Sequence, residues 1–471
     1  MKKTLIAAVL VSAFASLAAP TYAAGEAKNV IFFLGDGMGP TTVTAARIYK
    51  YKEEGELNME KLDGKTRTAR IKTYSNDAQT TDSAPSMAAY MTGVKMNNEV
   101  LSMTPDTKAV DAAGKAYQVG GDSTCPAGNG KPVDTILEIA KAKGKAVGAV
   151  TTTRVTHATP AATYSHICNR DAENTIAAQA VVGGAGYNTK LGDGLDVLLG
   201  GGTQFFLPTT AGGKRTDGRD LIAEMKTKGY TYAATGTALA AIDGKNTNKL
   251  FGLFNKDHMS YELDRVKTKA DEPSLSAMTL KAIDVLGKKP EGFFLMVEGG
   301  RIDHALHGTN AKRVLEDAVA FDDAIKAALD EMQKRDPGLK NTLIVVTADH
   351  DHTMTFNGYG KRGSNILGTV KDYRNGAEMK DVNGKNYTTL VFGNGPNRPN
   401  VRTNLIEGAA DKTQVLHDDY QQETGVRTSS ETHGGGDVML FATGAGTASK
   451  TFKGTLDNTK VFGLLKSAFG F

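Results

Sequence analysis

Continuous apolar runs recur along the chain, and each one gives way to polar residues within one or two positions. Runs of this length and composition are typical of strands that are buried on both faces of a sheet. Between them lie segments with apolar residues at helical spacing, of which residues 311–334 form the clearest amphipathic helix. This alternation predicts an α/β fold built on a doubly wound, mostly parallel sheet. The predicted strands are residues 29–34, 146–150, 293–297, 341–346 and 438–442, and further helices are predicted at 135–142, 221–228 and 274–286.

The stretch 292–307, which reads GFFLMVEGGRIDHALH, passes from a predicted strand directly into candidate chemistry. Glu298 ends the apolar run, and the two glycines after it allow the backbone to turn sharply. Asp303 and His307 are four residues apart, so on a helix they lie on one face and could share a metal ion. An ordinary polar helix start is the alternative interpretation, because acidic residues favour helix N-termini.

Two further segments carry single residues suited to phosphate chemistry. Asp36 follows the first predicted strand and lies among three glycines, so the backbone can come close to an ion or a phosphate. Ser83 stands just before Pro85, which fits the first turn of a helix, so the serine would lie at a helix N-terminus that favours an oxyanion. Asp82 and Ser83 are both good helix caps, and simple capping is the alternative for this segment.

Histidines are concentrated in the loops that follow predicted strands. Five of the nine lie there, and they are His157, His304, His307, His350 and His433. Mixed Asp and His ligation without cysteine suits two zinc ions, whereas an all-oxygen set suits magnesium. A serine at a helix start and the planar fork of Arg170, which suits phosphate oxygens, complete a set that indicates phosphoryl transfer assisted by two metals.

Six motifs occur in the order found in alkaline phosphatases, and the match runs over essentially the whole chain after its first residues. They read DGMG, TDSAPS, HATPAA with YSHICNR, VEGGRIDHALH, TADHDH and ETHGGG. The chain therefore resembles the alkaline phosphatase family. The resemblance implies a three-layer α/β/α sandwich around a sheet of about ten strands, usually as a homodimer. It also implies hydrolysis of small phosphate monoesters with two zinc ions and one magnesium ion.

The resemblance assigns roles to residues within these motifs. Ser83 resembles the nucleophile that becomes phosphoserine, and Arg170 resembles the clamp that binds phosphate with two N–H groups. One zinc ion would activate the water that cleaves the intermediate, and the other would lower the pKa of the serine. The expected ligands are Asp303, His307 and His433 for the first zinc, Asp36, Asp349 and His350 for the second, and Asp36, Thr159 and Glu298 for magnesium, with Asp82, His157 and His304 beside the metals or the phosphate.

Two features separate this chain from parts of the family. Some bacterial members carry Asp and Lys at the positions of His157 and His304, whereas animal members and several bacterial ones resemble this chain. The choice between magnesium and zinc at the third site therefore stays open. Animal members bind calcium through a glutamate that follows a GLF motif, and here that position is Asn255, so no calcium site is expected.

Residues 1–23 have the features of an export signal. Lys2 and Lys3 precede an apolar stretch that is too short for a membrane span, and a small-residue cleavage site follows near Ala23. The formal charge of +4 falls by two when the two lysines are removed. No block of Lys or Arg indicates nucleic acid or an anionic membrane as the main partner. The protein is expected in the periplasm or outside the cell.

The rest of the chain, residues 24–471, is expected to form a single catalytic domain. Its segment at about 356–430 is rich in Gly and Asn and poor in periodicity, which indicates an insertion over the rim of the core. The insertion falls where animal members carry their crown. Cys125 and Cys168 are the only cysteines, and such a pair in an oxidising compartment predicts a disulfide bond.

The residues by themselves are also compatible with other functions. A phosphodiesterase or a sulfatase could use the same core, but diesterase relatives commonly have Thr as nucleophile. Sulfatases need a C/S-x-P-x-R pattern, in which Met87 stands here in place of the arginine. From a different class, a non-catalytic phosphate-binding protein would need neither the serine nor the zinc ligands.

Overall fold

The computed structural model describes residues 25–62 and 67–471. The predicted export signal, residues 1–23, lies outside these described residues. Within them, no helix combines the length and the apolar character that a membrane span needs.

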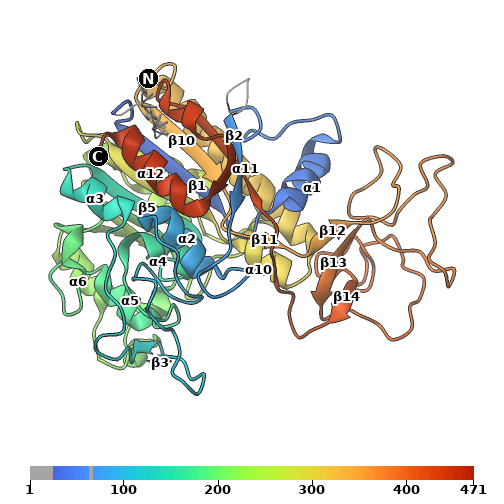
Figure 1. The fold of residues 1–471 in the computed structure, drawn as a ribbon, viewed down its shortest axis with the longest axis horizontal. Helices are drawn as coiled ribbons and strands as arrows, with labels where there is room; N and C mark the ends of the chain where they lie inside the picture. Colours follow the sequence, from blue (N-terminus) through green and yellow to red (C-terminus); the bar gives the residue numbers. More distant parts are fainter. Residues whose placement is uncertain (1–24, 63–66) are drawn as a thin grey trace, which may run out of the picture.

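A ten-stranded sheet forms the centre of the molecule (Figure 1). Its strand order is β17-β2-β16-β10-β1-β9-β5-β6-β8-β7, and only β16 runs antiparallel to its neighbours. The predicted doubly wound, mostly parallel sheet is therefore confirmed. Its strands are β1 (Asn29–Gly35), β2 (Arg67–Lys72), β5 (Ala146–Arg154), β6 (Val197–Gly201), β7 (Thr231–Ala233), β8 (Leu250–Leu253), β9 (Phe293–Gly299), β10 (Thr342–Thr347), β16 (Val438–Gly444) and β17 (Gly454–Asp457).

The register of the central strands aligns the polar residues at their ends. β1 lies between β9 and β10, and Leu34 is opposite both Glu298 and Thr347. On the other side of β9, Thr151 of β5 is also opposite Glu298. Because these strands are parallel, the loops that follow them emerge at one edge of the sheet. Every residue of β9 and β10 is buried, which explains why these strands appear in the sequence as unbroken apolar runs.

Helices cover the sheet in two groups. On one side α11 packs against α1, α8, α9 and α10, and on the other α2 packs against α3, α4 and α12. The long predicted helix is confirmed as α11, whose buried residues follow helical spacing. The helices are α1 (Pro40–Tyr51), α2 (Ser83–Thr92), α3 (Ile136–Ala142), α4 (Ala158–Tyr164), α5 (Glu173–Gln179), α6 (Leu221–Thr227), α7 (Gly236–Ala241), α8 (Glu262–Thr268), α9 (Leu275–Leu286), α10 (Arg301–His307), α11 (Ala311–Arg335) and α12 (Asn458–Phe469).

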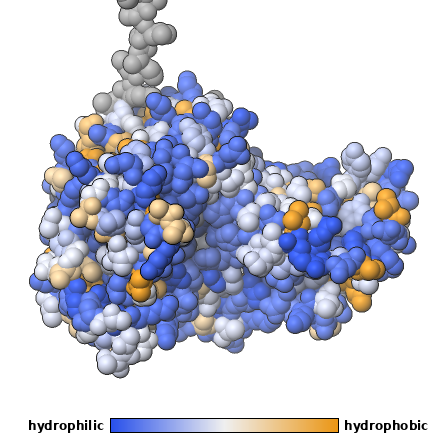
Figure 2. Space-filling view, turned by 60° about the horizontal axis from the view of Figure 1, so that its bottom comes forward, coloured by the Kyte–Doolittle hydropathy of each residue, from blue (hydrophilic) through white to orange (hydrophobic). Residues whose placement is uncertain are grey.

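A second lobe projects from the sandwich, on the right of Figure 1. It contains a three-stranded sheet of β12 (Met354–Phe356), β13 (Leu390–Gly395) and β14 (Thr424–Arg427), and we refer to residues 354–427 as the rim lobe. Figure 2 shows a recess with a mainly hydrophilic surface between this lobe and the body. Two pairs of short strands complete the fold, β3 (Gln118–Val119) with β4 (Asp122–Ser123), and β11 (Asp351–His352) with β15 (His433–Gly434).

The predicted disulfide bond is present. Cys125 and Cys168 are joined, with their Cα atoms 6.0 Å apart, and the described residues contain no free cysteine. The bond ties the segment that follows β4 to the segment that follows α4. Arg170 lies only two residues beyond Cys168, so the bond restrains the backbone that carries the predicted phosphate clamp.

Candidate metal and phosphate site

Four carboxylates are buried together at the edge of the sheet where β1, β9 and β10 end. They are Asp36, Glu298, Asp303 and Asp349, and none is more than 3 % exposed. Burial raises the pKa of Glu298 to about 7 and that of Asp349 to about 6. Burial and the neighbouring Asp349 also raise the pKa of Asp36 well above its ordinary value. Buried carboxylates that repel one another in this way suit a site that binds cations.

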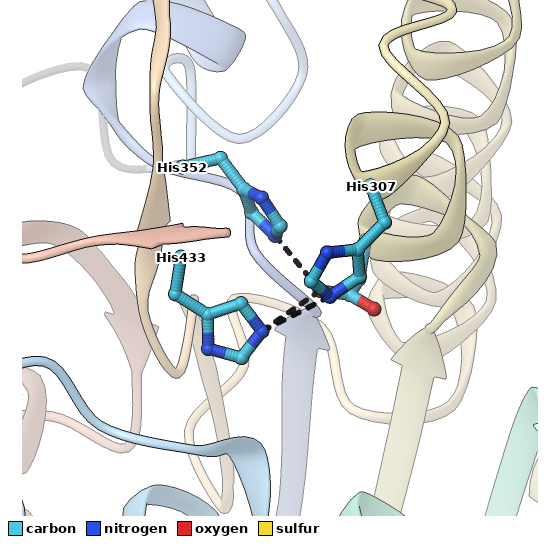
Figure 3. Close-up of side chains that lie close together, drawn as sticks. His307, His352 and His433 are labelled. Carbon is cyan, nitrogen blue, oxygen red and sulfur yellow. Dashed lines mark hydrogen bonds and ion pairs between the residues drawn. The ribbon is translucent and has the colours of Figure 1, made fainter. Parts of the chain in front are cut away.

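The first predicted zinc ligands converge around Asp303. His307 Nε2 lies 3.4 Å and His433 Nε2 lies 3.5 Å from Asp303 Oδ1, and the two imidazole nitrogens are 3.2 Å apart. Figure 3 shows the rings of His307, His352 and His433 pointing toward one another from three separate segments. The second nitrogens of two rings face backbone carbonyls, since His307 Nδ1 lies 2.7 Å from Glu431 O and His433 Nδ1 lies 2.8 Å from Thr81 O. These contacts orient both Nε2 atoms toward Asp303, an arrangement that could hold one metal ion.

His352 belongs to the same cluster, although sequence reasoning gave it no role. Its Nε2 lies 2.8 Å from Asp303 Oδ1 and its Nδ1 lies 2.6 Å from Glu431 Oε2. Burial alone would lower the pKa of His352, but these two carboxylates raise it to about 10. The ring is therefore positioned to hold Asp303 in place. Its position two residues after His350 in the TADHDH motif was the available signal, but Glu431 lies 79 residues away.

The second predicted set surrounds Ser83. The serine Oγ lies 3.1 Å from His350 Nε2 and 3.5 Å from Asp36 Oδ1. His350 Nε2 is in turn 3.3 Å from Asp36 Oδ1 and 3.5 Å from Asp349 Oδ2. The backbone N–H groups of Gly37 and His350 donate to the other oxygen of Asp349, each at 3.0 Å, so Oδ2 stays directed at the cluster.

The third predicted set contains buried oxygens that have no hydrogen-bond partner among the described residues. They belong to Asp36 (Oδ2), Thr159 (Oγ1) and Glu298 (Oε1), and Asp349 Oδ2 is in the same state. Thr151 and Thr153 donate their hydroxyls to the other oxygen of Glu298, the latter at 3.1 Å. Unpaired oxygens in the protein interior are costly unless something binds them, and an all-oxygen set is what magnesium prefers. The chemistry of these oxygen atoms, and of the Asp and His side chains in the two other sets, therefore fits the metals that the resemblance implies.

Arg170 reaches this cluster from the segment after the disulfide bond. Its Nη1 pairs with Asp82, and its Nη2 lies 2.8 Å from His157 Nε2. Asp82 occupies the cap position of α2, but its side chain makes no capping hydrogen bond. It instead accepts from the Glu99 backbone N–H at 2.8 Å as well as from Arg170. Simple capping by the Asp82 side chain is therefore wrong, and this carboxylate orients the arginine.

Three imidazoles gather beside Arg170, namely those of His157, His258 and His304. The centroid of the His157 ring lies 5.2 Å from that of His258 and 5.3 Å from that of His304. The centroids of the His258 and His304 rings are 4.2 Å apart. Burial lowers the pKa of His304 to about 3 and lowers that of His157 well below its ordinary value, with Arg170 adding to the second shift. Sequence reasoning missed His258, which lies in the loop after β8, because the nearby GLF motif was considered only for a calcium site at Asn255.

Comparisons with known proteins show which family this chain resembles. The family model described as alkaline phosphatase matches residues 27–471. The tissue-nonspecific isozyme of alkaline phosphatase from Rattus norvegicus is 38% identical over 449 residues, which cover 89% of this chain and 79% of that protein. An alkaline phosphatase from Gadus morhua is 38% identical over 462 residues, which cover 91% and 89%.

Solved structures give the same result. The crystal structure of Thermus thermophilus alkaline phosphatase superposes with a TM-score of 0.68 at 26% identity, covering 98% of this chain and 96% of that one. The alkaline phosphatase from the Antarctic bacterium TAB5 superposes with a TM-score of 0.64 at 26% identity, covering 94% and 98%.

Proposed function

Because the chain belongs to the alkaline phosphatase family, we propose that it hydrolyses phosphate monoesters to an alcohol and inorganic phosphate through a phosphoserine formed on Ser83. The observation that carries this proposal is the position of the Ser83 hydroxyl. It lies within 3.5 Å of Asp36 and His350, beside carboxylate oxygens that have no hydrogen-bond partner in residues 25–62 and 67–471. A nucleophile in such surroundings is suited to activation by a bound cation.

Two zinc ions and one magnesium ion are proposed as the resident metals. When bound, they would supply Lewis acidity toward phosphate oxygens and lower the pKa of the serine and of water. A TAB5 alkaline phosphatase variant in which a histidine is replaced by glutamate is described with magnesium bound in its M3 site. In this chain the support for magnesium is the all-oxygen set of Asp36, Thr159 and Glu298. The proposed ligands are Asp303, His307 and His433 for one zinc, Asp36, Asp349 and His350 for the other, and Asp36, Thr159 and Glu298 for magnesium.

The protein's own groups define the two steps of the proposed reaction. Ser83 Oγ attacks phosphorus, and the bond from phosphorus to the leaving alcohol breaks as the new O–P bond forms. Water then attacks the phosphoserine, inorganic phosphate departs, and the serine hydroxyl is restored. Arg170 donates two N–H groups to non-bridging phosphate oxygens in both steps, and Asp82 fixes its orientation.

A substrate panel tests this proposal. Purified protein, with its zinc and magnesium content measured, would be assayed on an aryl phosphate, an aryl phosphodiester and an aryl sulfate with the same leaving group. We expect fast turnover of the monoester alone. Preferred turnover of the diester or the sulfate would instead assign the protein to a different activity on the same core, and binding of phosphate without turnover would indicate a binding protein.

Export and assembly are part of the same proposal. A periplasmic or extracellular location is supported by the disulfide bond, which persists in oxidising compartments. We also propose that residues 24–471 act as a single catalytic domain with an insertion at about 356–430, and that two copies form a homodimer.

A further inference from the structure

Each imidazole beside the phosphate clamp faces an arginine. Arg170 Nη2 donates to His157 Nε2 at 2.8 Å, and Arg301 Nη1 donates to His304 Nδ1 at 2.9 Å. Arg154 Nη1 makes a short contact with His258 Nε2, and the Arg154 backbone N–H donates to Nδ1 of the same ring at 3.2 Å. Three guanidinium groups therefore surround three imidazoles in one continuous cluster.

The charges of two of these arginines are neutralised, and that of Arg301 is not. Arg170 pairs with Asp82, and Arg154 pairs with Glu173 and Asp257. Among residues 25–62 and 67–471, no carboxylate oxygen lies within 4.0 Å of an Arg301 nitrogen.

Arg301 is instead held by contacts that leave its charge available. Its guanidinium carbon lies 3.7 Å from the centroid of the Tyr261 ring, and its Nε is buried without a hydrogen-bond partner. Burial raises the pKa of the nearby Asp317 to about 8, and the charge of Arg301 offsets part of this rise. Arg301 as a residue is partly exposed.

A metal ion is the first alternative for this cluster, because three imidazoles can bind zinc. A dication would, however, sit among three guanidinium groups and would have to displace N–H donors that already occupy one nitrogen of His157 and of His304 and both nitrogens of His258. An anion, in contrast, would be attracted by the guanidinium groups and could accept hydrogen bonds from them. It would neutralise Arg301, and it could also accept from His304 Nε2, which carries the proton because Nδ1 accepts from Arg301.

We propose that Arg301 and His304 bind a second phosphate group carried by the leaving alcohol, so that the favoured substrates are bisphosphates. The inference rests on the proposed function, since the first phosphate must occupy Arg170 and Ser83. His157 bridges the two positions, because its ring contacts Arg170 on one side and lies 5.3 Å from the His304 ring on the other. One phosphate is transferred to Ser83 and then to water, and the second leaves with the alcohol.

Matched alkyl substrates test the inference. The parent would be assayed on straight-chain alkyl monophosphates and on α,ω-alkanediol bisphosphates of two to six carbons, with free magnesium and zinc held constant. We expect the parent to favour the bisphosphate of one optimal length, and Arg301→Gln to lower the bisphosphate-to-monophosphate ratio of kcat/KM by about tenfold. High salt should also lower the bisphosphate-to-monophosphate ratio of kcat/KM in the parent.

Arg313→Gln is the matched control, because Arg313 also lies near the Tyr261 ring but is paired with Asp264 and Asp419. It should keep the ratio of the parent. A parent that hydrolyses monophosphates without preferring any bisphosphate, or a preference that survives Arg301→Gln, overturns the inference while leaving the proposed function intact. A parent that hydrolyses no monophosphate overturns the proposed function itself. An additional bound zinc ion that is lost in His258→Gln would show that the cluster is a metal site instead.

Discussion

Ser83 combines burial with neighbours that have unpaired oxygens, which is the residue-scale basis of the proposed chemistry. The serine is 2 % exposed and stands at the first position of α2. We expect Ser83→Ala to abolish the phosphoenzyme and to lower kcat at least about 10³-fold, while the metal content and the fold persist. Trapping with labelled phosphate at low pH, followed by peptide mapping, checks this prediction.

Ser165→Ala is the control for this experiment, because the Ser165 hydroxyl is also buried and has no hydrogen-bond partner. It should retain the label at Ser83. Label found on Ser86, which lies in the same peptide, would show that the nucleophile has been misassigned.

His352 makes a separate prediction at the residue scale. Its two carboxylate contacts fix Asp303, and neighbours that orient metal ligands typically contribute 10–100-fold in metal affinity. We expect His352→Gln to weaken zinc binding by about that factor, measured by competition with a chromophoric chelator. His417→Gln, at a histidine outside the cluster, should bind zinc as the parent does. Unchanged affinity in His352→Gln would mean that Asp303 needs no such support.

His157 and His304 stand where some bacterial members of the family carry Asp and Lys, and the two positions bear on the third metal site and on phosphate. Burial and Arg170 keep His157 neutral, and its Nδ1 has no partner. We expect His157→Asp combined with His304→Lys to raise magnesium affinity and to tighten phosphate inhibition by about tenfold, because both changes add charge-assisted hydrogen bonds. The maximal rate should fall if product release limits turnover.

Magnesium titrations and competitive phosphate inhibition at one alkaline pH measure these effects. The two single variants serve as controls, since the aspartate should act on magnesium and the lysine on phosphate. A double variant that needs as much magnesium as the parent, and binds phosphate no more tightly, would mean that neither imidazole sets metal or phosphate affinity.

At the scale of elements, the disulfide bond connects stability with phosphate binding. It closes a loop with a sequence separation of 43 residues, which corresponds to about 3–4 kcal/mol in the chain-entropy model. We expect Cys125→Ala with Cys168→Ala to lower the unfolding free energy by about that amount and to weaken phosphate inhibition, because Arg170 follows Cys168 closely.

Denaturant unfolding and phosphate inhibition check the two parts of this prediction. Reducing agent should destabilise the parent and leave the double variant unchanged. Two thiols titrating in the unreduced, unfolded parent would contradict the bond itself.

Burial on one or on both faces decides which strands the sequence can predict. β1, β9 and β10 are covered on both faces, so their apolar runs predicted them to within about two residues. β2 was not predicted, because its sequence RTARIK alternates and only one face packs inward, with Ile71 buried and the Arg70 side chain 64% exposed. Strands with one exposed face near the end of a sheet lack the continuous pattern that marks central strands.

The site is assembled from segments of the whole molecule, and this decides which of its residues can be predicted from the sequence. Each assigned ligand lies in a motif next to a strand end, where local sequence is informative, and the parallel sheet brings these ends together. His352 and Glu431, or His258 and Arg154, become partners only through contacts between distant segments. Local sequence does not reveal the role of such residues, even where a motif contains one of them, because that role depends on what the fold brings next to them.

Exposed apolar side chains are concentrated on the rim lobe, and they carry a last prediction about the whole molecule. Val401 is 80% exposed and Val426 is 61% exposed. The segments that carry them are joined by a hydrogen bond, in which Arg427 Nη2 donates to Asn400 Oδ1 at 3.1 Å. Figure 2 shows apolar patches on this lobe beside a mostly hydrophilic surface. Several exposed apolar side chains on one lobe favour association, and the proposed homodimer supplies a partner with the same surface. The exposed large apolar side chains of the lobe are Phe356, Tyr359, Tyr373, Val382, Val401, Ile406 and Val426.

We therefore expect Val401→Asp with Val426→Asp to shift the protein toward monomer at concentrations where the parent is a dimer, because the charges would be desolvated in the interface. Light scattering coupled to size-exclusion chromatography over a dilution series measures the shift. Val266→Asp is the matched control, since Val266 on α8 is also 61% exposed but lies outside the lobe, and it should keep the dimer. A dimer that survives the double substitution would place the interface elsewhere, and a parent that is monomeric at every concentration would contradict the homodimer.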